Sequence, residues 1–301
     1  MDGAQLGRND WWRYGLAFIL FIGGYLGSVI VLARGLEAGY GALSALFPEH
    51  FSQQPFAYLL DLDVGWPDAP LLSGLYLFSS LMMSIIIAIP VLWIVVVWVH
   101  RRPFSGIFGW NGFDWRMFRR SFAAASVGCS LAAAVGVMLF WSRLVINSDW
   151  VNFISYLLVA VVLVPLQVLA EELVFRGYIL QSVSMITKRS WLRICIPALT
   201  FAFLHYDSIE VQTAPVFAMG YFVMLSLYIT WFAVRSGGIA AAVGFHLALN
   251  MFAAFVIITS LSPQISPTTF YIDAPAAWAL PLEIIFVIAV HHALMKRWRV
   301  L

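Results

Sequence analysis

Residues 74–99 read GLYLFSSLMMSIIIAIPVLWIVVVWV, a stretch without a charged side chain. About 20 consecutive apolar residues suffice for an α-helix to cross the ~30 Å hydrocarbon layer of a membrane. The whole chain has the same character, since 62% of its 301 residues are hydrophobic and 11% are charged. In soluble domains roughly 45–50% of the residues are hydrophobic and about 25% are charged. We therefore expect an integral membrane protein and exclude soluble, disordered and solenoid proteins.

Further apolar stretches predict an all-α, polytopic transmembrane helical bundle of about eight spans. These cover residues 14–33, 74–99, 122–146, 153–187, 194–206, 215–234, 239–260 and 278–295. The fifth is too short to cross a membrane alone, so we expect its end at membrane depth, buried by protein or lining a wet cavity. A proline-containing loop, residues 34–73, follows the first span.

The distribution of charge predicts the orientation of the bundle. With a cytoplasmic N-terminus, fourteen of the seventeen Lys and Arg residues fall in cytoplasmic segments, where such residues concentrate. Both termini are therefore expected in the cytoplasm of a multi-pass protein, which we assign to the bacterial inner (plasma) membrane. The net charge of +2 is too small to indicate a nucleic-acid partner. Cys129 and Cys195 lie in apolar runs and are expected to pack there.

Few ionisable side chains lie inside the predicted spans. Each costs about 2.5–3.5 kcal/mol to insert, so each is a candidate functional residue. They are Glu171, Glu172, Arg176, His205, His246 and Glu283. Glu283 begins the last span and is expected at the interface, as are His291 and His292 near its basic end. We also expect His100 at a span boundary, outside any site.

The sequence Glu171-Glu172-Leu173-Val174-Phe175-Arg176 places two carboxylates on consecutive helical positions. Their side chains diverge by about 100°, so they should have different roles. Glu172 and Arg176 are spaced i,i+4 in the order that favours an ion pair, which leaves Glu171 free to react. The alternative is an ion pair that only locks helix packing.

Two histidines belong to the same set. His205 ends the run Phe201–His205, and His246 stands four residues before Asn250, so that imidazole and carboxamide share one helical face. Either histidine alone could be an interhelical hydrogen-bonding residue. Together with Glu171, the three side chains supply a base, a proton-handling partner and donors for an oxyanion.

These residues resemble the motifs of the CAAX protease and bacteriocin-processing family of intramembrane endopeptidases, also called the Abi family. The match comprises the Glu-Glu-x-x-x-Arg motif of residues 171–176, the Phe-x-x-x-His motif of residues 201–205 and the final motif, which runs from Arg235 to His246 and Asn250. It covers roughly residues 155–255. Ser226 and Thr230 stand where many members have glycines, so contact with the substrate could differ there.

The resemblance implies a glutamic-type peptidase acting on a peptide or lipid-modified protein in the bilayer. Glu171 would activate a water that His205 orients, His246 and Asn250 would stabilise the oxyanion, and Glu172 with Arg176 would hold the helix. Residues 151–301 would form the catalytic core. Residues 1–150, with three spans and the loop 34–73, carry no recognised signature.

Two alternatives stay open. The first is a zinc protease in which Glu171, His205 and His246 bind the metal, because two His and a Glu are ligands that zinc accepts. We favour catalysis without a cofactor because the sequence lacks a His-Glu-x-x-His helix and Asn250 is a poor zinc ligand. The second is a non-enzymatic membrane scaffold or immunity protein.

Overall fold

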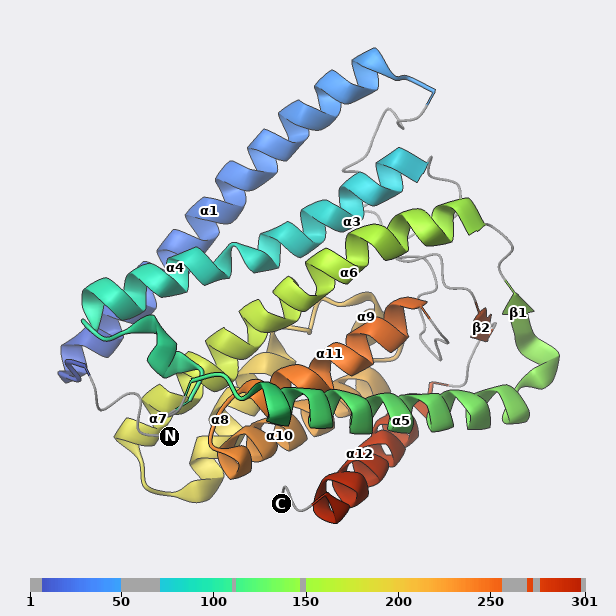
Figure 1. The fold of residues 1–301 in the computed structure, drawn as a ribbon. Coiled ribbons are helices and arrows are strands. Elements are labelled where there is room, and N and C mark those ends of the chain that lie inside the picture. The colour runs from blue at the N-terminus through green and yellow to red at the C-terminus, as the bar shows by residue number, and fades with distance from the viewer. Residues whose placement is uncertain are drawn as a thin grey trace.

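The computed structural model describes residues 7–49, 71–109, 112–146, 150–255, 270–272 and 277–298. Nearly all of them are helical (Figure 1). The longer helices are α1 (Trp11–Leu46), α3 (Leu71–Ile86), α4 (Ala88–Ile94), α5 (Trp115–Leu139), α6 (Trp150–Glu172), α8 (Ser190–Phe203), α10 (Pro215–Ser236), α11 (Ala240–Phe255) and α12 (Ala279–Arg297).

Short elements connect these helices. They are the π-helices η3 (Val95–Val99) and η6 (Leu173–Ile179), the 3₁₀-helices η4 (Phe104–Ile107) and η5 (Trp141–Arg143), and the α-helices α7 (Leu180–Ile186) and α9 (Ile209–Thr213). Strands β1 (Leu144–Ile146) and β2 (Phe270–Ile272) pair antiparallel, with Leu144 opposite Ile272. This small ladder leaves the all-α class unchanged.

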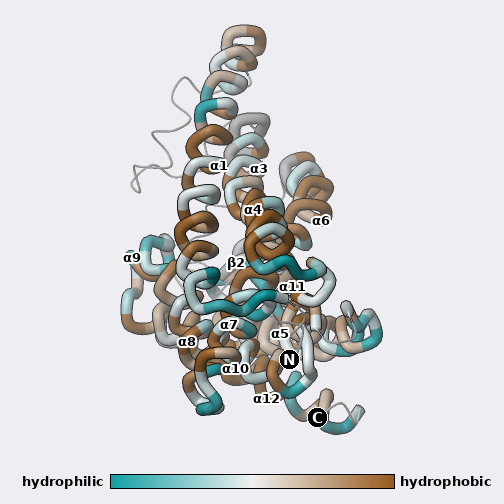
Figure 2. The backbone as a smooth tube through the Cα atoms, turned by 90° about the vertical axis from the view of Figure 1, so that its left-hand side faces the viewer, coloured by the Kyte–Doolittle hydropathy of each residue, from teal (hydrophilic) through white to brown (hydrophobic). Residues whose placement is uncertain are grey.

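Six helices within the described ranges are long and apolar enough to cross a membrane, and two shorter apolar helices accompany them. The six are Trp11–Leu46, Phe78–Val99, Trp115–Leu139, Phe153–Ile186, Pro215–Ser236 and Ala279–Arg297; the shorter ones are Ser190–Phe203 and Ala240–Ala254. Hydrophobic residues occur along the whole length of these helices (Figure 2). The prediction of a multi-pass, all-α membrane protein is confirmed, whereas eight spans and two cytoplasmic termini stay predictions.

Two helix boundaries differ from the sequence prediction. The first helix was expected to end near residue 33 but continues to Leu46, and Arg34 forms an ion pair along it with Glu37, at 3.0 Å. Charged residues one turn apart satisfy each other and do not interrupt a helix. The stretch 153–187 is divided by η6. Residues 50–70 of the predicted loop 34–73 and residues 256–260 of the seventh span lie outside the described residues.

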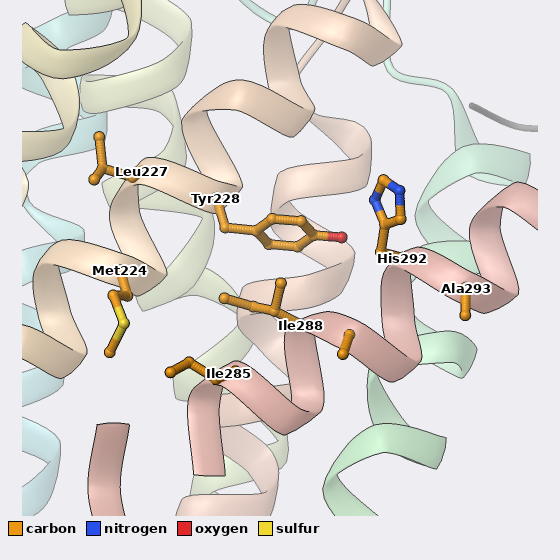
Figure 3. A pocket seen from close by; sticks show the side chains of 8 residues that line it. Met224, Leu227, Tyr228, Ile285, Ile288, His292 and Ala293 are labelled. Atoms are coloured by element: carbon orange, nitrogen blue, oxygen red, sulfur yellow. The ribbon is translucent and has the colours of Figure 1, made fainter. Parts of the chain in front are cut away.

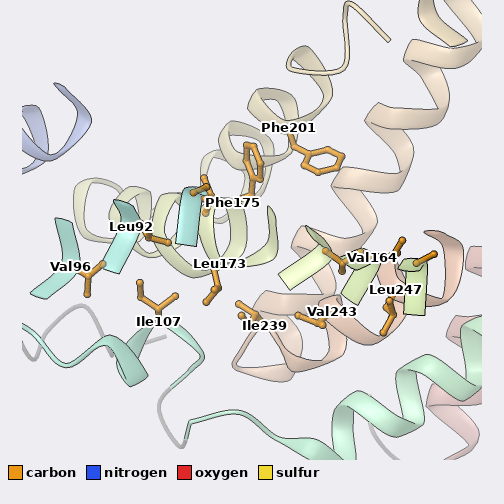
Figure 4. Close-up of a cluster of buried hydrophobic side chains, with 14 of the residues drawn as sticks. Leu92, Val96, Ile107, Val164, Leu173, Phe175, Phe201, Ile239, Val243 and Leu247 are labelled. Atoms are coloured by element: carbon orange, nitrogen blue, oxygen red, sulfur yellow. The ribbon is translucent and has the colours of Figure 1, made fainter. Parts of the chain in front are cut away.

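Helix α11 is the centre of the packing, because it contacts α5, α6 and α10. A buried hydrophobic cluster fills the space around it (Figure 4). In this cluster Val164 of α6 lies beside Val243 and Leu247 of α11, and Phe175 of η6 contacts Phe201 of α8 edge to face. The apolar side chains thereby bring α6, η6, α8 and α11 together, and these elements carry the polar residues of the central spans.

Gly244 allows α11 to approach α5 closely. A Cβ atom at this position would lie 2.5 Å from the Phe118 carbonyl oxygen and 2.9 Å from the Phe122 backbone nitrogen. Backbone atoms cannot move aside as a flexible side chain can. We therefore expect Gly244→Ala to lower the free energy of unfolding by about 1–3 kcal/mol, measured by denaturant titration in detergent.

The control for this substitution is Gly220→Ala in α10, where an added Cβ would meet no atom within 4 Å. Alanine is a better helix former than glycine, so this variant should be unchanged or stabilised by roughly 0.5–1 kcal/mol. Equal stabilities of the two alanine variants would contradict the close approach of α5 and α11.

His100 lies directly after η3, at the expected span boundary, and is buried there. Its Nε2 lies 2.9 Å from the Tyr178 hydroxyl of η6, and its Nδ1 lies 3.2 Å from the Arg8 carbonyl oxygen. Burial lowers the pKa of His100 and so favours the neutral ring. The imidazole thus connects the chain before α1 to the π-helix that follows the two glutamates.

Candidate active site

The predicted ion pair between Glu172 and Arg176 is formed and fully buried. Arg176 Nη1 lies 2.9 Å from Glu172 Oε1, and neither side chain is exposed. Arg176 belongs to the π-helix η6, which begins directly after Glu172. Such wider turns are rare and occur frequently at functional sites. The regular α-helix is thus interrupted at the position of the Glu172–Arg176 pair.

Arg176 is enclosed by polar and aromatic groups of two further helices. Its Nη2 donates to Ser226 Oγ at 2.7 Å and its Nε to Thr230 Oγ1 at 3.2 Å, both in α10. The guanidinium also lies 4.5 Å above the centre of the Phe201 ring. A buried cation is tolerated when it is paired and hydrogen-bonded in this way. Ser226 and Thr230 therefore serve as partners of the arginine.

His246 lies between the two carboxylates. Its Nδ1 is 2.8 Å from Glu172 Oε1, and its Nε2 is 3.6 Å from Glu171 Oε2. Glu172 is fully buried, whereas the Glu171 side chain is 12% exposed. The two consecutive carboxylates therefore contact one imidazole ring, each at a different nitrogen. Their environments nevertheless differ, with Glu172 committed to Arg176 and Glu171 more accessible.

Asn250 has a partner that the sequence analysis missed. Its Nδ2 donates to Gln167 Oε1 at 3.2 Å, and the Gln167 side chain is buried. Gln167 precedes Glu171 by four residues on α6, as His246 precedes Asn250 on α11, so the two helices meet in two polar contacts one turn apart. A glutamine within an apolar stretch, four residues before the glutamates, was the available signal.

His205 lies in the turn after α8, at the end of the short fifth apolar segment. Its ring is 4.5 Å from the Phe201 ring centre and 4.3 Å from that of Phe222. Its Nδ1 lies 2.9 Å from the Phe201 carbonyl oxygen, so this nitrogen carries the proton and Nε2 is the acceptor. The Phe201 ring also contacts His246, with 5.8 Å between ring centres.

Glu171, Glu172, Arg176, His246 and Asn250 are thus gathered between α6, η6, α10 and α11. His205 joins them through Phe201, and within the described ranges no hydrogen bond or ion pair connects it directly to Glu171 or His246. No group of three or more His, Cys, Asp or Glu side chains in the described part of the chain is arranged to hold a metal ion.

Comparison with known proteins identifies the family of the chain. Residues 150–252 match the sequence profile of a family described as type II CAAX prenyl endopeptidase Rce1-like. The chain is also 30% identical over 259 residues to the uncharacterized protein YyaK of Bacillus subtilis (strain 168). The aligned region covers 83% of this chain and 79% of YyaK. This chain belongs to the Rce1-like family. No solved structure matches it significantly.

Membership of the Rce1-like family indicates a membrane protease. The matched residues contain all six polar side chains of the predicted motifs, from Glu171 to Asn250, and exclude α1, α3, α4 and α5. The segment matched by the family is thus the one from α6 to α11, in which the polar contacts lie.

His291 corrects a further expectation for this Rce1-like chain. It was expected at the interface but is fully buried, with Nδ1 2.6 Å from the Tyr228 hydroxyl and Nε2 3.0 Å from Ser121 Oγ. These partners lie on α10 and α5, far away in the sequence, so position alone could not reveal them. His292 is exposed, as expected.

Proposed function

We propose that this Rce1-like chain is an intramembrane endopeptidase that hydrolyses a peptide bond with water activated by Glu171. The observation that supports this most is the contact of the Glu171 carboxylate with His246, 3.6 Å away, one turn from Asn250. A base, an imidazole and an amide donor on facing helices are the groups that peptide hydrolysis requires. Their enclosure by apolar helices strengthens each electrostatic interaction.

Charge balance determines where the proton of the site resides. Glu171, Glu172 and Arg176 together carry one net negative charge when both carboxylates are ionised. Because an unbalanced charge is costly inside a membrane protein, a proton on the His246–Glu171 couple is favoured. The Glu172 carboxylate accepts the His246 Nδ1–H and so fixes the orientation of the ring, with Nε2 toward Glu171. With that proton on His246, Glu171 is an ionised base and His246 Nε2–H is a donor.

The reaction then proceeds without a covalent intermediate. Glu171 takes a proton from water, the oxygen bonds to the scissile carbonyl carbon, and His246 and Asn250 donate hydrogen bonds to the resulting oxyanion. The proton on Glu171 passes to the leaving amine as the C–N bond breaks. His205 Nε2, an acceptor, orients the water. Glu172 and Arg176 position His246 and contact no reacting atom.

The substrate class follows from the family description and from the location of the site. We propose a peptide or lipid-modified protein held in or at the bilayer, in accordance with the prenyl endopeptidase described for the family. The test compares membrane and secreted peptides from cells that contain the native chain or Glu171→Gln. A fragment that depends on the native chain supports hydrolysis, whereas identical peptide sets and undiminished biological activity of the variant favour a membrane scaffold.

We propose further that the reaction needs no cofactor. The Asn250 amide donates to Gln167 and so acts as a hydrogen-bonding group, and the sequence lacks a His-Glu-x-x-His helix. Activity should therefore survive exhaustive chelation. Loss of activity by chelation and its recovery with zinc would instead favour Glu171, His205 and His246 as metal ligands.

Gln167 is expected to position Asn250. Gln167→Met keeps the side-chain length but removes the acceptor of the Asn250 N–H, so kcat should fall about tenfold with little change in KM, as expected for the loss of one hydrogen bond of ~1.4 kcal/mol. In an Asn250→Ala background the same substitution should have no further effect. Equal effects in both backgrounds would indicate that Gln167 acts through packing alone.

A further inference from the structure

A shallow groove lies between α10 and α12 (Figure 3). It is lined by Met224, Leu227 and Tyr228 of α10 and by Ile285, Ile288, Ala289, His292 and Ala293 of α12. The sequences of the two helices share a pattern at positions i, i+4, i+7 and i+11, which begins in this lining and continues beyond it. Two apolar or aromatic residues are followed by a ring with a polar nitrogen and then by a cation. On α10 these are Met224, Tyr228, Trp231 and Arg235, and on α12 they are Ile285, Ala289, His292 and Lys296.

The two helices run in the same direction. Tyr228 contacts His291, with 5.7 Å between ring centres, and Trp231, one turn further along α10, contacts the next residue of α12, His292, also at 5.7 Å. The groove between them has a volume of about 610 Å³, and its lining is apolar except at Tyr228 and His292. The parallel arrangement brings Arg235 and Lys296 to the same end of the groove.

The length of this pattern corresponds to one leaflet of a bilayer. Eleven residues separate Met224 from Arg235 and Ile285 from Lys296, which is about 17 Å of helix at ~1.5 Å per residue. Half of a ~30 Å hydrocarbon layer is ~15 Å. Apolar side chains therefore extend from the level of the cations to about the membrane midplane, which is the depth reached by one acyl chain.

The cationic end is accessible to a ligand. Arg235, His292 and Lys296 are exposed, and no ion pair involves Arg235 or Lys296 in the part of the chain that the structure describes. Trp231, a residue enriched at membrane–water interfaces, lies next to them. Basic pockets between transmembrane helices on the cytoplasmic side bind anionic headgroups, and this end carries the positive charge typical of that side.

We propose that the groove between α10 and α12 binds an anionic phospholipid of the inner leaflet. One acyl chain packs along Met224, Ile285 and Ala289, and the phosphate lies between Arg235 and Lys296. This site is separate from the candidate active site, because Ser226 and Thr230, which bind Arg176, face the other side of α10. The proposal therefore does not depend on the peptidase function.

The test uses the full chain in detergent, delipidated and titrated with phosphatidylglycerol or phosphatidylcholine of identical acyl chains, with bound lipid counted by native mass spectrometry. The native chain should prefer phosphatidylglycerol. Each cation near an anionic headgroup accounts for about a fivefold change in affinity, so Arg235→Gln/Lys296→Gln should reduce the preference roughly twentyfold. Ala289→Trp fills the groove and should weaken binding of both lipids.

The matched control is Lys188→Gln/Arg189→Gln, which removes the same charge from the turn between α7 and α8 and should leave the preference intact. Thermal unfolding of each variant shows whether it is folded. Equal binding of the two lipids by the native chain would overturn the proposal. So would an unchanged preference after loss of Arg235 and Lys296, or groove binding of an uncharged isoprenoid that these substitutions do not alter.

Discussion

Glu171→Gln is expected to reduce peptide hydrolysis about a thousandfold, because it removes the base from the site and leaves the rest of the side chain nearly unchanged. General acid–base catalysis contributes roughly 10²–10⁴ in rate, and glutamine cannot take a proton from water. The Glu171 side chain is partly exposed and takes no part in the buried ion pair, so the variant should fold normally. The measurement is single-turnover cleavage of an identified substrate by purified protein, with thermal unfolding in parallel.

The matched control for Glu171→Gln is Glu37→Gln in α1, where the carboxylate is exposed and pairs with Arg34. It makes the same chemical change outside the site and should retain full activity. If Glu171→Gln cleaved the substrate as rapidly as the native chain, Glu171 would not be the base, and a non-hydrolytic role of the family fold in this protein would have to be considered.

Arg176→Met is expected to lower the free energy of unfolding by about 3–5 kcal/mol, the usual effect of removing one partner of a buried ion pair. The substitution leaves the Glu172 carboxylate fully buried without its cation, and it removes the hydrogen bonds to Ser226 and Thr230. Denaturant titration in detergent measures the loss. Arg34→Met breaks an exposed pair instead and should cost at most about 1 kcal/mol.

The double variant Glu172→Gln/Arg176→Met separates stability from activity. Neutralising both residues removes the uncompensated charge, so much of the stability should return. Activity should stay low because an amide oxygen accepts a weaker hydrogen bond from His246 Nδ1–H than a carboxylate does, so the ring is less well positioned. If the double variant were as unstable as Arg176→Met alone, the loss would arise from the packing of the guanidinium against Phe201 and not from its charge.

Much of this arrangement was predictable from the sequence, since local spacing and hydrophobicity carry the information. The i,i+4 spacing predicted the ion pair between Glu172 and Arg176, and the apolar runs predicted the helices. In a membrane protein a charged residue must find a polar partner, so short-range partners such as this pair can be read from the chain.

The rest depended on contacts between distant helices. His246 reaches both glutamates, Gln167 holds Asn250, and His291 finds Tyr228 and Ser121, yet each partner lies more than sixty residues away. A single sequence does not show which residues of two distant helices come into contact. The π-helix η6 was equally hidden, since it lies where Gly177 packs against the distant Ile107 and where Arg176 donates to Ser226 of α10.

The length of α1 has a consequence for the outer surface of the protein. Its 36 residues measure about 54 Å, against a hydrocarbon layer of ~30 Å. Even at a steep tilt of ~40° the helix would rise ~41 Å, so its last turns must stand clear of the lipid tails. Figure 1 shows this end projecting past α3 and α6. The exposed Arg34–Glu37 pair, at 3.0 Å, lies toward this end of the helix, where charged side chains are best accommodated outside the lipid tails.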